Sequence, residues 1–271
     1  SGGTVTLTAT AGSITMTSGV QTVSVTGADD AVVDYTAGSN IGISIIDSDG
    51  AVTLDAGGAI YDNLSGEVSG TDTNLRGGTI VAVLIAETGI GHLSTASQDD
   101  LDIEVAKLTF TNGTSGNVYI EESDHLELVG ASTTSGSDGS VSIESIFGGI
   151  EFTGTVMLNA DAGDLIVLAD DSQSILVDNA VSSLNGSISL LSSNIFYQSA
   201  AGDITVSGSG EFIYVVATDI IFMEDGAVSS SNGGTIVYGS VNSGIALGQL
   251  TTGSSGTIFV GLSNDAIGGI T

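Results

Sequence analysis

Carboxylates are the side chains of this sequence with the clearest chemical potential, and several of them are adjacent. Among 32 Asp and Glu residues, the close groups are Asp29-Asp30, Asp99-Asp100, Asp170-Asp171 and Glu121-Glu122 with Asp124. Two carboxylates on one face serve polysaccharide hydrolases, one protonated as the acid and one ionised as the base. Adjacent residues of a strand point to opposite faces, however, and the groups share no common spacing. We therefore expect solvated turns here, no catalytic residues and no enzyme.

Oxygen ligands for calcium are the second candidate chemistry. The segment from Asp47 to Gly50 begins like an EF-hand loop, but Ala51 stands where the third oxygen ligand belongs. Three later oxygen-bearing residues are spaced so that neighbouring turns can share an ion. The candidate residues for weak calcium binding are Asp47, Asp49, Asn159, Asp161 and Asp164. We expect loose condensation of cations on the acidic surface to be commoner than such sites, and no cofactor to be required.

The other reactive residue types are scarce. The chain has no Cys, and its two histidines, His92 and His125, are isolated from each other. A zinc site is therefore not expected. Only Arg76 and Lys107 are basic, and the formal net charge is -30, which excludes nucleic acid and anionic membrane surfaces as partners. The longest apolar run, residues 80–86, is too short to span a bilayer.

The elements that position these residues are indicated by a recurring tripeptide, Gly-x-aliphatic. Gly50-Ala51-Val52, Gly186-Ser187-Ile188 and Gly234-Thr235-Ile236 are examples, and the series extends from Gly3 to Gly256. Apolar and polar residues alternate after each glycine, as in a strand with one buried face. Leu101 to Leu108 alternates in the same way, so we predict a strand there and no helix anywhere. We expect the 40 Gly to supply positive φ at sharp corners.

Short strands about nine residues apart fit either hairpins or a parallel coil. Three strands per coil give roughly 22–28 residues per coil, a common length for solenoid repeats. The absence of Pro favours the coil, because every inner strand donates hydrogen bonds on both sides. The predicted fold is all-β: a right-handed parallel β-helix (β-solenoid) of roughly ten coils without clear caps, forming a single domain over residues 1–271.

Three segments resemble the repeats of giant bacterial surface proteins of the filamentous-haemagglutinin kind. They are Ala51 to Ile60, Thr114 to Glu122 and Ala200 to Val206. The resemblance implies secretion by Gram-negative bacteria and a right-handed parallel β-helix. The resemblance extends over most of the chain, and it lies in the pattern of the repeats. The N-terminal secretion domain of such proteins is not recognisable in this sequence, which leaves the export route open.

The function that we expect is mechanical. The chain would form a rigid rod in a bacterial extracellular filament or cell-surface adhesin, with glycans or a host or neighbouring cell surface as further partners. The terminal segments still carry the repeat pattern, which indicates either a piece of a longer rod or head-to-tail stacking of copies. The alternative is a carbohydrate-active or glycan-binding β-helix module. A threonine-rich ice- or surface-binding face, based on Thr4, Thr6, Thr8 and Thr10, ranks last.

Overall fold

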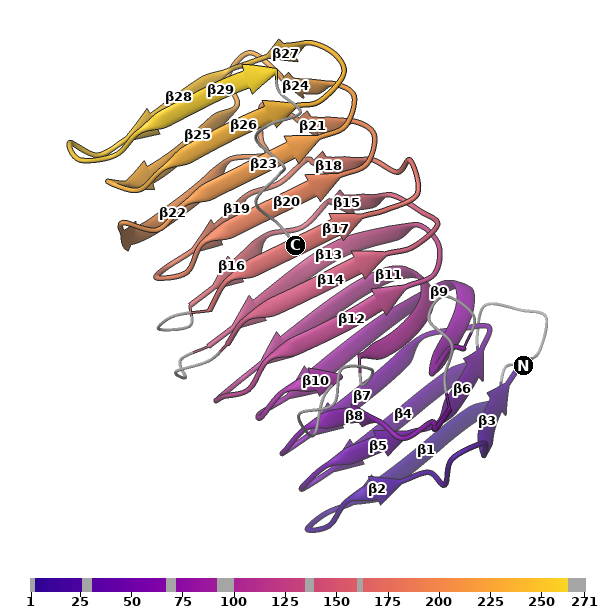
Figure 1. The fold of residues 1–271 in the computed structure, drawn as a ribbon. Coiled ribbons are helices and arrows are strands. Elements are labelled where there is room, and N and C mark those ends of the chain that lie inside the picture. Colours follow the sequence, from indigo (N-terminus) through magenta and orange to yellow (C-terminus); the bar gives the residue numbers. More distant parts are fainter. Residues whose placement is uncertain are drawn as a thin grey trace.

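A computed structural model describes residues 3–25, 31–66, 72–91, 100–134, 139–159 and 163–262 of the chain. Within these residues the chain forms 29 strands and no helix. Strands three apart in sequence pair in parallel, for example β14 with β17 and β17 with β20. The chain therefore winds into a parallel β-solenoid of about ten stacked coils (Figure 1). The predicted parallel coil is confirmed, and the hairpin alternative is wrong.

Each coil contributes strands to three parallel sheets. The first sheet contains β1 (Thr4–Ala9), β4 (Val32–Ala37), β7 (Val52–Ala56), β16 (Val156–Leu158), β19 (Val181–Ser183), β22 (Ile204–Ser209), β25 (Val228–Asn232) and β28 (Gln249–Thr252). The second contains β2 (Ile14–Thr15), β5 (Ile41–Ile43), β8 (Ile60–Asp62), β10 (Ile90–Gly91), β12 (Val118–Glu122), β14 (Val141–Ser145), β17 (Leu165–Ala169), β20 (Ile188–Ser192), β23 (Ile213–Ala217), β26 (Ile236–Ser240) and β29 (Ile258–Leu262).

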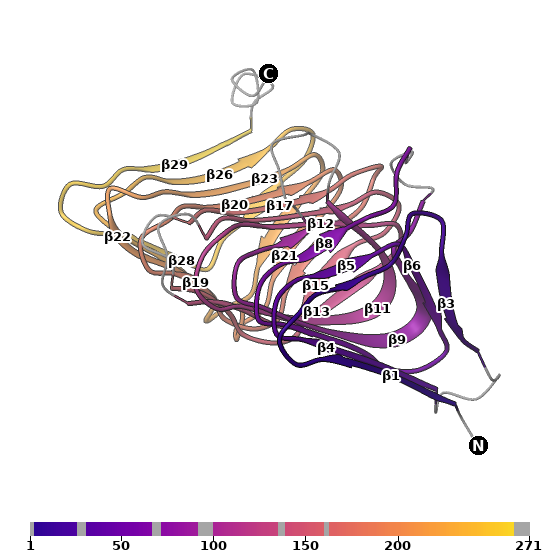
Figure 2. The same cartoon turned by 90° about the horizontal axis from the view of Figure 1, so that it is seen from below.

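The third sheet contains β3 (Gln21–Ser24), β6 (Ile45–Ser48), β15 (Ile150–Phe152), β18 (Ile175–Val177), β21 (Phe196–Gln198), β24 (Ile221–Met223) and β27 (Ile245–Ala246). Three longer strands run on from the third sheet into the first: β9 (Leu75–Ala86), β11 (Leu101–Asn112) and β13 (Leu126–Thr133). The predicted strand at Leu101 to Leu108 is thus confirmed as part of β11. Strands β1 and β3 lie at one end of the stack, and β28 and β29 lie at the other (Figure 2).

Aliphatic side chains form continuous ladders inside the coil. In the second sheet Leu165 pairs with Ile188, Ile188 with Ile213, Ile213 with Ile236 and Ile236 with Ile258, so one coil takes 22 to 25 residues. The four members from Leu165 to Ile236 are completely buried. β-Branched residues suit this position because their stiff side chains pack well on a pleated surface. Stacked aliphatic residues therefore build the core, as the alternation in the sequence predicts.

Near the C-terminal end, the interior also holds a polar network. Gln198, Ser229 and Tyr238 are all completely buried. The Tyr238 hydroxyl donates to Oε1 of Gln198 at 3.0 Å and lies 2.6 Å from Oγ of Ser229. Nε2 of Gln198 donates to the carbonyl oxygen of Val228. Because these groups satisfy one another, the network keeps polar atoms in the core without the cost of orphaned hydrogen-bonding groups.

The repeated glycines have a different role from the one expected. Among the described glycines of the tripeptide series, Gly116 alone has a positive φ. At Gly50, Gly186 and Gly234 a Cβ atom would instead lie 1.5 to 1.7 Å from a carbonyl oxygen of the preceding coil. Positive φ occurs at other glycines, among them Gly19, Gly210, Gly226 and Gly233, so the expectation holds at those positions but does not explain the tripeptide series. At Gly50, Gly186 and Gly234, glycine is needed because successive coils approach too closely for any side chain.

The described residues offer no helix that is long and apolar enough to cross a membrane.

Candidate functional site

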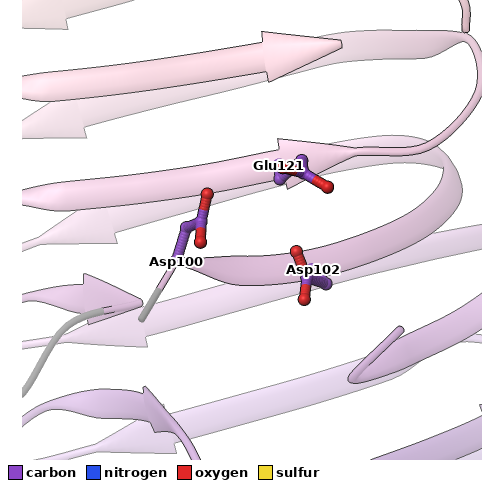
Figure 3. A group of neighbouring side chains, drawn as sticks. All are labelled: Asp100, Asp102 and Glu121. Carbon is purple, nitrogen blue, oxygen red and sulfur yellow. The ribbon is translucent and has the colours of Figure 1, made fainter. Parts of the chain in front are cut away.

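Three carboxylates meet on the outer side of β11 and β12. Asp102 of β11 lies opposite Glu121 of β12 in the strand register, and Asp100 immediately precedes β11. One carboxylate oxygen from each residue lies within 4.8 Å of the others. Figure 3 shows the three side chains gathered between the two strands. We call Asp100, Asp102 and Glu121 the acidic triad.

Asp102 is the most enclosed member of the acidic triad. Its neighbours Leu101 and Ile103 point into the core, so alternation places Asp102 on the outer side of β11, yet only 5% of its surface is exposed. Burial and, to a smaller extent, the nearby charges of Glu121, Asp100, Asp62 and Asp72 together raise the pKa of the Asp102 carboxyl to about 8. The surroundings of Asp102 thus disfavour an isolated negative charge.

The main chain around Asp102 is held by a buried asparagine. Asn74 is completely buried, and its Oδ1 accepts a hydrogen bond from the Asp102 nitrogen at 2.9 Å. The Asn74 nitrogen donates to the Asp102 carbonyl oxygen, and its Nδ2 donates to the carbonyl oxygen of Ser44 and to Oδ1 of Asp62. Because these bonds cross three successive coils, they fix the backbone that carries the acidic triad.

Glu122, next to the acidic triad, points the opposite way. Its side chain is completely buried inside the coil, where Oε1 accepts a hydrogen bond from the Asp124 nitrogen and Oε2 accepts one from the Val105 nitrogen. Burial raises the pKa of the Glu122 carboxyl well above its ordinary value, and the side chain of Asp124 raises it further. The opposite orientation of adjacent carboxylates, Glu121 and Glu122, agrees with the strand geometry used in the sequence analysis.

The calcium candidates from the sequence lie elsewhere. Asp47 belongs to β6, opposite Arg76 of β9, and Asp49 follows in the next bend. Oδ1 of Asp164 accepts a hydrogen bond from the Ser187 nitrogen at 2.7 Å, so this carboxylate caps the next coil. Asn159 is described, and Asp161 lies outside the described residues. Calcium binding at these five positions stays a prediction. None of the three residues of the acidic triad was among these candidates.

The remaining sequence candidates are dispersed. Asp29, Asp30, His92 and Asp99 lie outside the described residues. Asp170 and Asp171 occupy an exposed turn, where Oδ1 of Asp170 accepts a hydrogen bond from the Asp171 nitrogen. His125 lies near Glu151, with 3.8 Å between Nε2 and Oε2. Asp170 and Asp171 thus occupy the solvated turn expected of them. For Glu121 and Glu122 the expectation of a solvated turn is wrong, because both lie within strand β12 and are buried.

A second surface of chemical interest runs along the outer side of the third sheet. Toward the C-terminal end of this sheet, the outward side chains change from charged residues to aromatic ones. Glu127 accepts hydrogen bonds from Lys107 and Thr153, and the Lys107 ammonium lowers the pKa of the Glu127 carboxyl. Further along, the rings of Tyr197 and Phe222 stack with their centroids 5.7 Å apart and their planes 9° from parallel. We call these two rings the aromatic pair.

A carboxylate borders the aromatic pair. The Tyr197 hydroxyl donates to Oε1 of Glu224, and Oε2 of Glu224 accepts from the Ala200 nitrogen at 3.0 Å. The bond to Tyr197 lowers the pKa of the Glu224 carboxyl, and the same bond raises the pKa of Tyr197 to about 12. Phe222 is 42% exposed, and the next outward position of the sheet is Ala246. The small alanine leaves space beside the ring of Phe222.

Comparisons of this chain with protein-family models, with curated proteins and with solved structures find no match. Its function is therefore argued from its own residues.

Proposed function

We propose that this chain is a structural rod of a bacterial extracellular filament or surface adhesin, and that copies of it stack end to end. The observation that carries the proposal is the exposure of core side chains on both terminal coils. In β29, Ile258 and Val260 are 40% and 48% exposed, whereas their partners in the preceding coil, Ile236 and Tyr238, are completely buried. Leu7 of β1 is 43% exposed, and its partner is buried in the same way.

Both terminal coils also present a strand edge. Among the described strands, β1 pairs only with β4 and β29 pairs only with β26. Each edge therefore carries main-chain donors and acceptors ready to pair with another strand. All the coils wind in the same direction, so the strands of the last coil of one copy would run parallel to those of the first coil of the next. A head-to-tail contact of this kind does not close on itself, and it produces an open filament.

The distribution of charge favours contact at the ends over contact at the sides. Residues 1–28 and 226–264 contain no Asp, Glu, Lys, Arg or His, although the formal net charge of the chain is -30. Nearly all the acidic side chains therefore belong to the coils between these segments. Like charges repel neighbouring rods side by side, whereas the uncharged ends meet without this penalty. The proposed occupant of each open end is thus a second copy of the same chain.

The test compares charged substitutions at the ends with one on the side. Wild-type protein is expected to form filaments by negative-stain electron microscopy and to sediment faster as its concentration rises. Leu7→Asp and Val260→Asp should abolish both effects, because each places a charge in the stacking surface. Phe147→Asp is the matched control, since Phe147 is 57% exposed in the turn between β14 and β15. A monomeric wild type, or filaments that persist in both end variants, would contradict the proposal.

The extracellular setting and the adhesin role are supported by the resemblance of the repeats to bacterial surface proteins. The acidic composition adds to this support, because a chain of this charge suits surroundings rich in salt and divalent ions. Detection of the native protein on intact cells by surface biotinylation would test the setting. Its recovery in the cytoplasmic fraction alone would count against it.

A second candidate function, glycan binding, is favoured by the aromatic pair. One face of the Phe222 ring looks along the ladder toward Ala246, where no large outward side chain follows. Sugar rings stack on such apolar surfaces, and the adjacent Glu224 carboxylate can accept hydrogen bonds from hydroxyl groups. The site would bind a neutral or basic glycan, since the surrounding charge is negative.

Glycan-array screening tests this second candidate, and Phe222→Ala is its diagnostic variant. The variant should lose any signal given by the wild type, whereas Phe147→Ala, which removes an exposed ring elsewhere, should keep it. Equal binding by the wild type and Phe222→Ala would exclude the aromatic pair as the glycan site.

A further inference from the structure

The outer face of the second sheet changes character between β14 and β17. Its outward positions include Glu121 in β12 and Glu144 in β14, whereas none of those from β17 to β29 is charged. Strands β17, β20, β23, β26 and β29 lie side by side (Figure 1). We call their outward residues the apolar face: Ile166, Leu168, Ser189, Leu191, Tyr214, Val216, Val237, Gly239, Phe259 and Gly261.

Large side chains of the apolar face are exposed. Ile166 is 43% exposed and Phe259 is 57% exposed, and Leu168, Leu191 and Val237 are partly exposed. With strands about 4.8 Å apart, the face extends roughly 19 Å along the stack. A contiguous apolar surface of this length on a chain of formal net charge -30 indicates a site of interaction with another molecule.

A hollow of about 270 Å³ opens into the apolar face. Its apolar side is formed by Leu168, Leu191, Tyr214 and Val216, and its polar side includes Ser193 and Thr218, which follow β20 and β23. Sites for free small molecules usually measure ~300–1,000 Å³ and enclose most of the ligand. The smaller hollow on this open face therefore suits apolar side chains that project from a larger partner.

Two carboxylates border the hollow on the side of β14. Glu144 lies opposite Leu168 in the strand register. Asp170 follows β17 and is exposed, and its nitrogen donates a hydrogen bond to the carbonyl oxygen of Ser145, the residue after Glu144. Burial raises the pKa of the Glu144 carboxyl, and neighbouring negative charges, that of Asp170 among them, raise it as well. A positive group beside these two carboxylates would relieve their repulsion.

A second copy of this chain does not supply that positive group. Arg76 and Lys107 are its only Arg and Lys residues. Nε of Arg76 lies 3.5 Å from Glu104, and Nζ of Lys107 lies 2.7 Å from Glu127, so both pair with carboxylates of other strands. Two copies side by side would also repel each other through their net charge. The partner therefore has to bring its own Lys or Arg next to its apolar side chains.

We propose that the apolar face docks a basic amphipathic helix of another protein. Outward residues of successive coils repeat about every 4.8 Å along the stack, close to the ~5.4 Å pitch of an α-helix. A helix laid along the stack thus presents about one apolar side chain to each coil, and roughly 13 residues cover the face. Its basic residues would pair with Glu144 and Asp170. The proposal does not depend on end-to-end stacking, since the face lies on the side of the solenoid.

The test measures peptide binding to the full chain by fluorescence anisotropy at physiological ionic strength. The probe is a fluorescein-labelled peptide of about 14 Leu and Lys residues, in which the leucines recur every three or four positions and share one helical face. The control peptide has the same composition with its leucines spread around the helix. The wild type should bind the probe at least ~10-fold more tightly, the effect of one buried aliphatic side chain. Equal binding of both peptides would overturn the proposal in favour of general attraction to an acidic surface.

Leu191→Ser is the diagnostic variant for the apolar contact. It removes an outward side chain that lines the hollow, so it should weaken probe binding about 10-fold. Met157→Ser is the matched control, because Met157 is 44% exposed on β16 of the first sheet, and it should bind the probe like the wild type. Ile166→Ser, at a position 43% exposed, replaces Leu191→Ser if that variant fails to fold. Unchanged binding in the diagnostic variant, or an equal loss in Met157→Ser, would overturn the site.

Glu144→Gln tests the charged border of the hollow. It should weaken probe binding about 2–5-fold and reduce its dependence on salt, as expected for the loss of one partly exposed ion pair. Asp34→Asn, which removes a carboxylate from β4 of the first sheet, is the control. Equal losses in both variants would mean that only the net charge of the chain matters, which would overturn the role of the border.

Two further results would assign the apolar face to a different occupant. If Leu191→Ser abolishes a self-association that persists in Leu7→Asp and Val260→Asp, the face binds a second copy of this chain. If the probe binds only to a variant that ends at Leu262, the occupant is the segment 263–271 of the same chain. Either result would overturn docking of another protein.

Discussion

The middle coils and the terminal coils of this solenoid share one kind of interior but present different surfaces. In the second sheet the same ladder of aliphatic residues runs from Ile14 to Ile258. The acidic triad and the charged residues of the third sheet lie in the middle, whereas residues 1–28 and 226–264 are uncharged. The ladder of aliphatic residues thus determines the fold, whereas the outer positions differ from coil to coil: they are charged in the middle of the stack and uncharged in the terminal coils.

The largest difference is expected for removal of an aliphatic rung. Ile188→Ala creates a cavity between Leu165 and Ile213 and should lower the free energy of unfolding by about 2–5 kcal/mol. Ile258→Ala removes the same atoms from the exposed end rung and should cost below about 1 kcal/mol. Urea denaturation followed by circular dichroism measures both. The measurement uses dilute protein, so that copies do not cover each other's ends. If the two variants lose equal free energy of unfolding, Ile258 is covered in solution, as filament formation predicts.

Glycine substitutions give the next largest contrast. A Cβ atom at Gly186 would lie 1.7 Å from the carbonyl oxygen of Gly163, whereas at Gly261 in β29 no atom lies within 4 Å. Gly186→Ala should therefore force two coils apart and cost about 1–3 kcal/mol. Gly261→Ala should change stability by less than about 0.5 kcal/mol. The same denaturation assay applies, and a neutral Gly186→Ala would refute close approach as the reason for the repeated glycine.

The buried polar network should give an intermediate effect. Tyr238→Phe removes a hydroxyl that Gln198 and Ser229 contact, and it leaves their polar atoms with fewer partners. The expected loss is about 1–3 kcal/mol. A neutral Tyr238→Phe would mean that water enters this part of the core.

The smallest effect is expected from pH. Burial and the nearby Asp178 raise the pKa of the Glu151 carboxyl above its ordinary value of 4.5. As pH falls from 7 toward 4.5, the folded state therefore takes up a proton before the unfolded state does, so this group makes unfolding more costly at lower pH. The gain should be below about 1 kcal/mol because Glu151 is partly exposed.

Glu151→Gln isolates this contribution. The free energy of unfolding of the wild type should rise relative to that of Glu151→Gln as the pH is lowered, measured at several pH values in one buffer system. A constant difference between the two proteins would contradict the raised pKa.

The fold was predictable because its signals are local and repeated. Alternation after each glycine, as at Gly186-Ser187-Ile188, indicates a strand that begins at the aliphatic residue, and β20 does begin at Ile188. The spacing of the bursts then indicates a coil length that the pairings confirm. The reason for the glycine was not predictable, since close approach to a neighbouring coil depends on contacts between residues more than twenty positions apart.

The sequence indicated some members of the acidic triad but not their arrangement in space. Asp100 and Glu121 belong to two of the adjacent groups singled out there, and the alternation of Leu101 and Ile103 around Asp102 indicates an outward position for that residue. That Asp102 lies opposite Glu121 depends on the register between β11 and β12. This register cannot be counted from the repeat, because the segment before β11 departs from the usual spacing.

The direction of the hydrogen bonds has a mechanical consequence. Since the strands of one coil pair with the strands of the next, these bonds run along the length of the stack. A pulling force along the stack would break the hydrogen bonds between one coil and the next before those further along. The coils should therefore separate one after another from the end that is pulled. Under tension such a molecule would yield in many small steps, because each coil contacts only its neighbours.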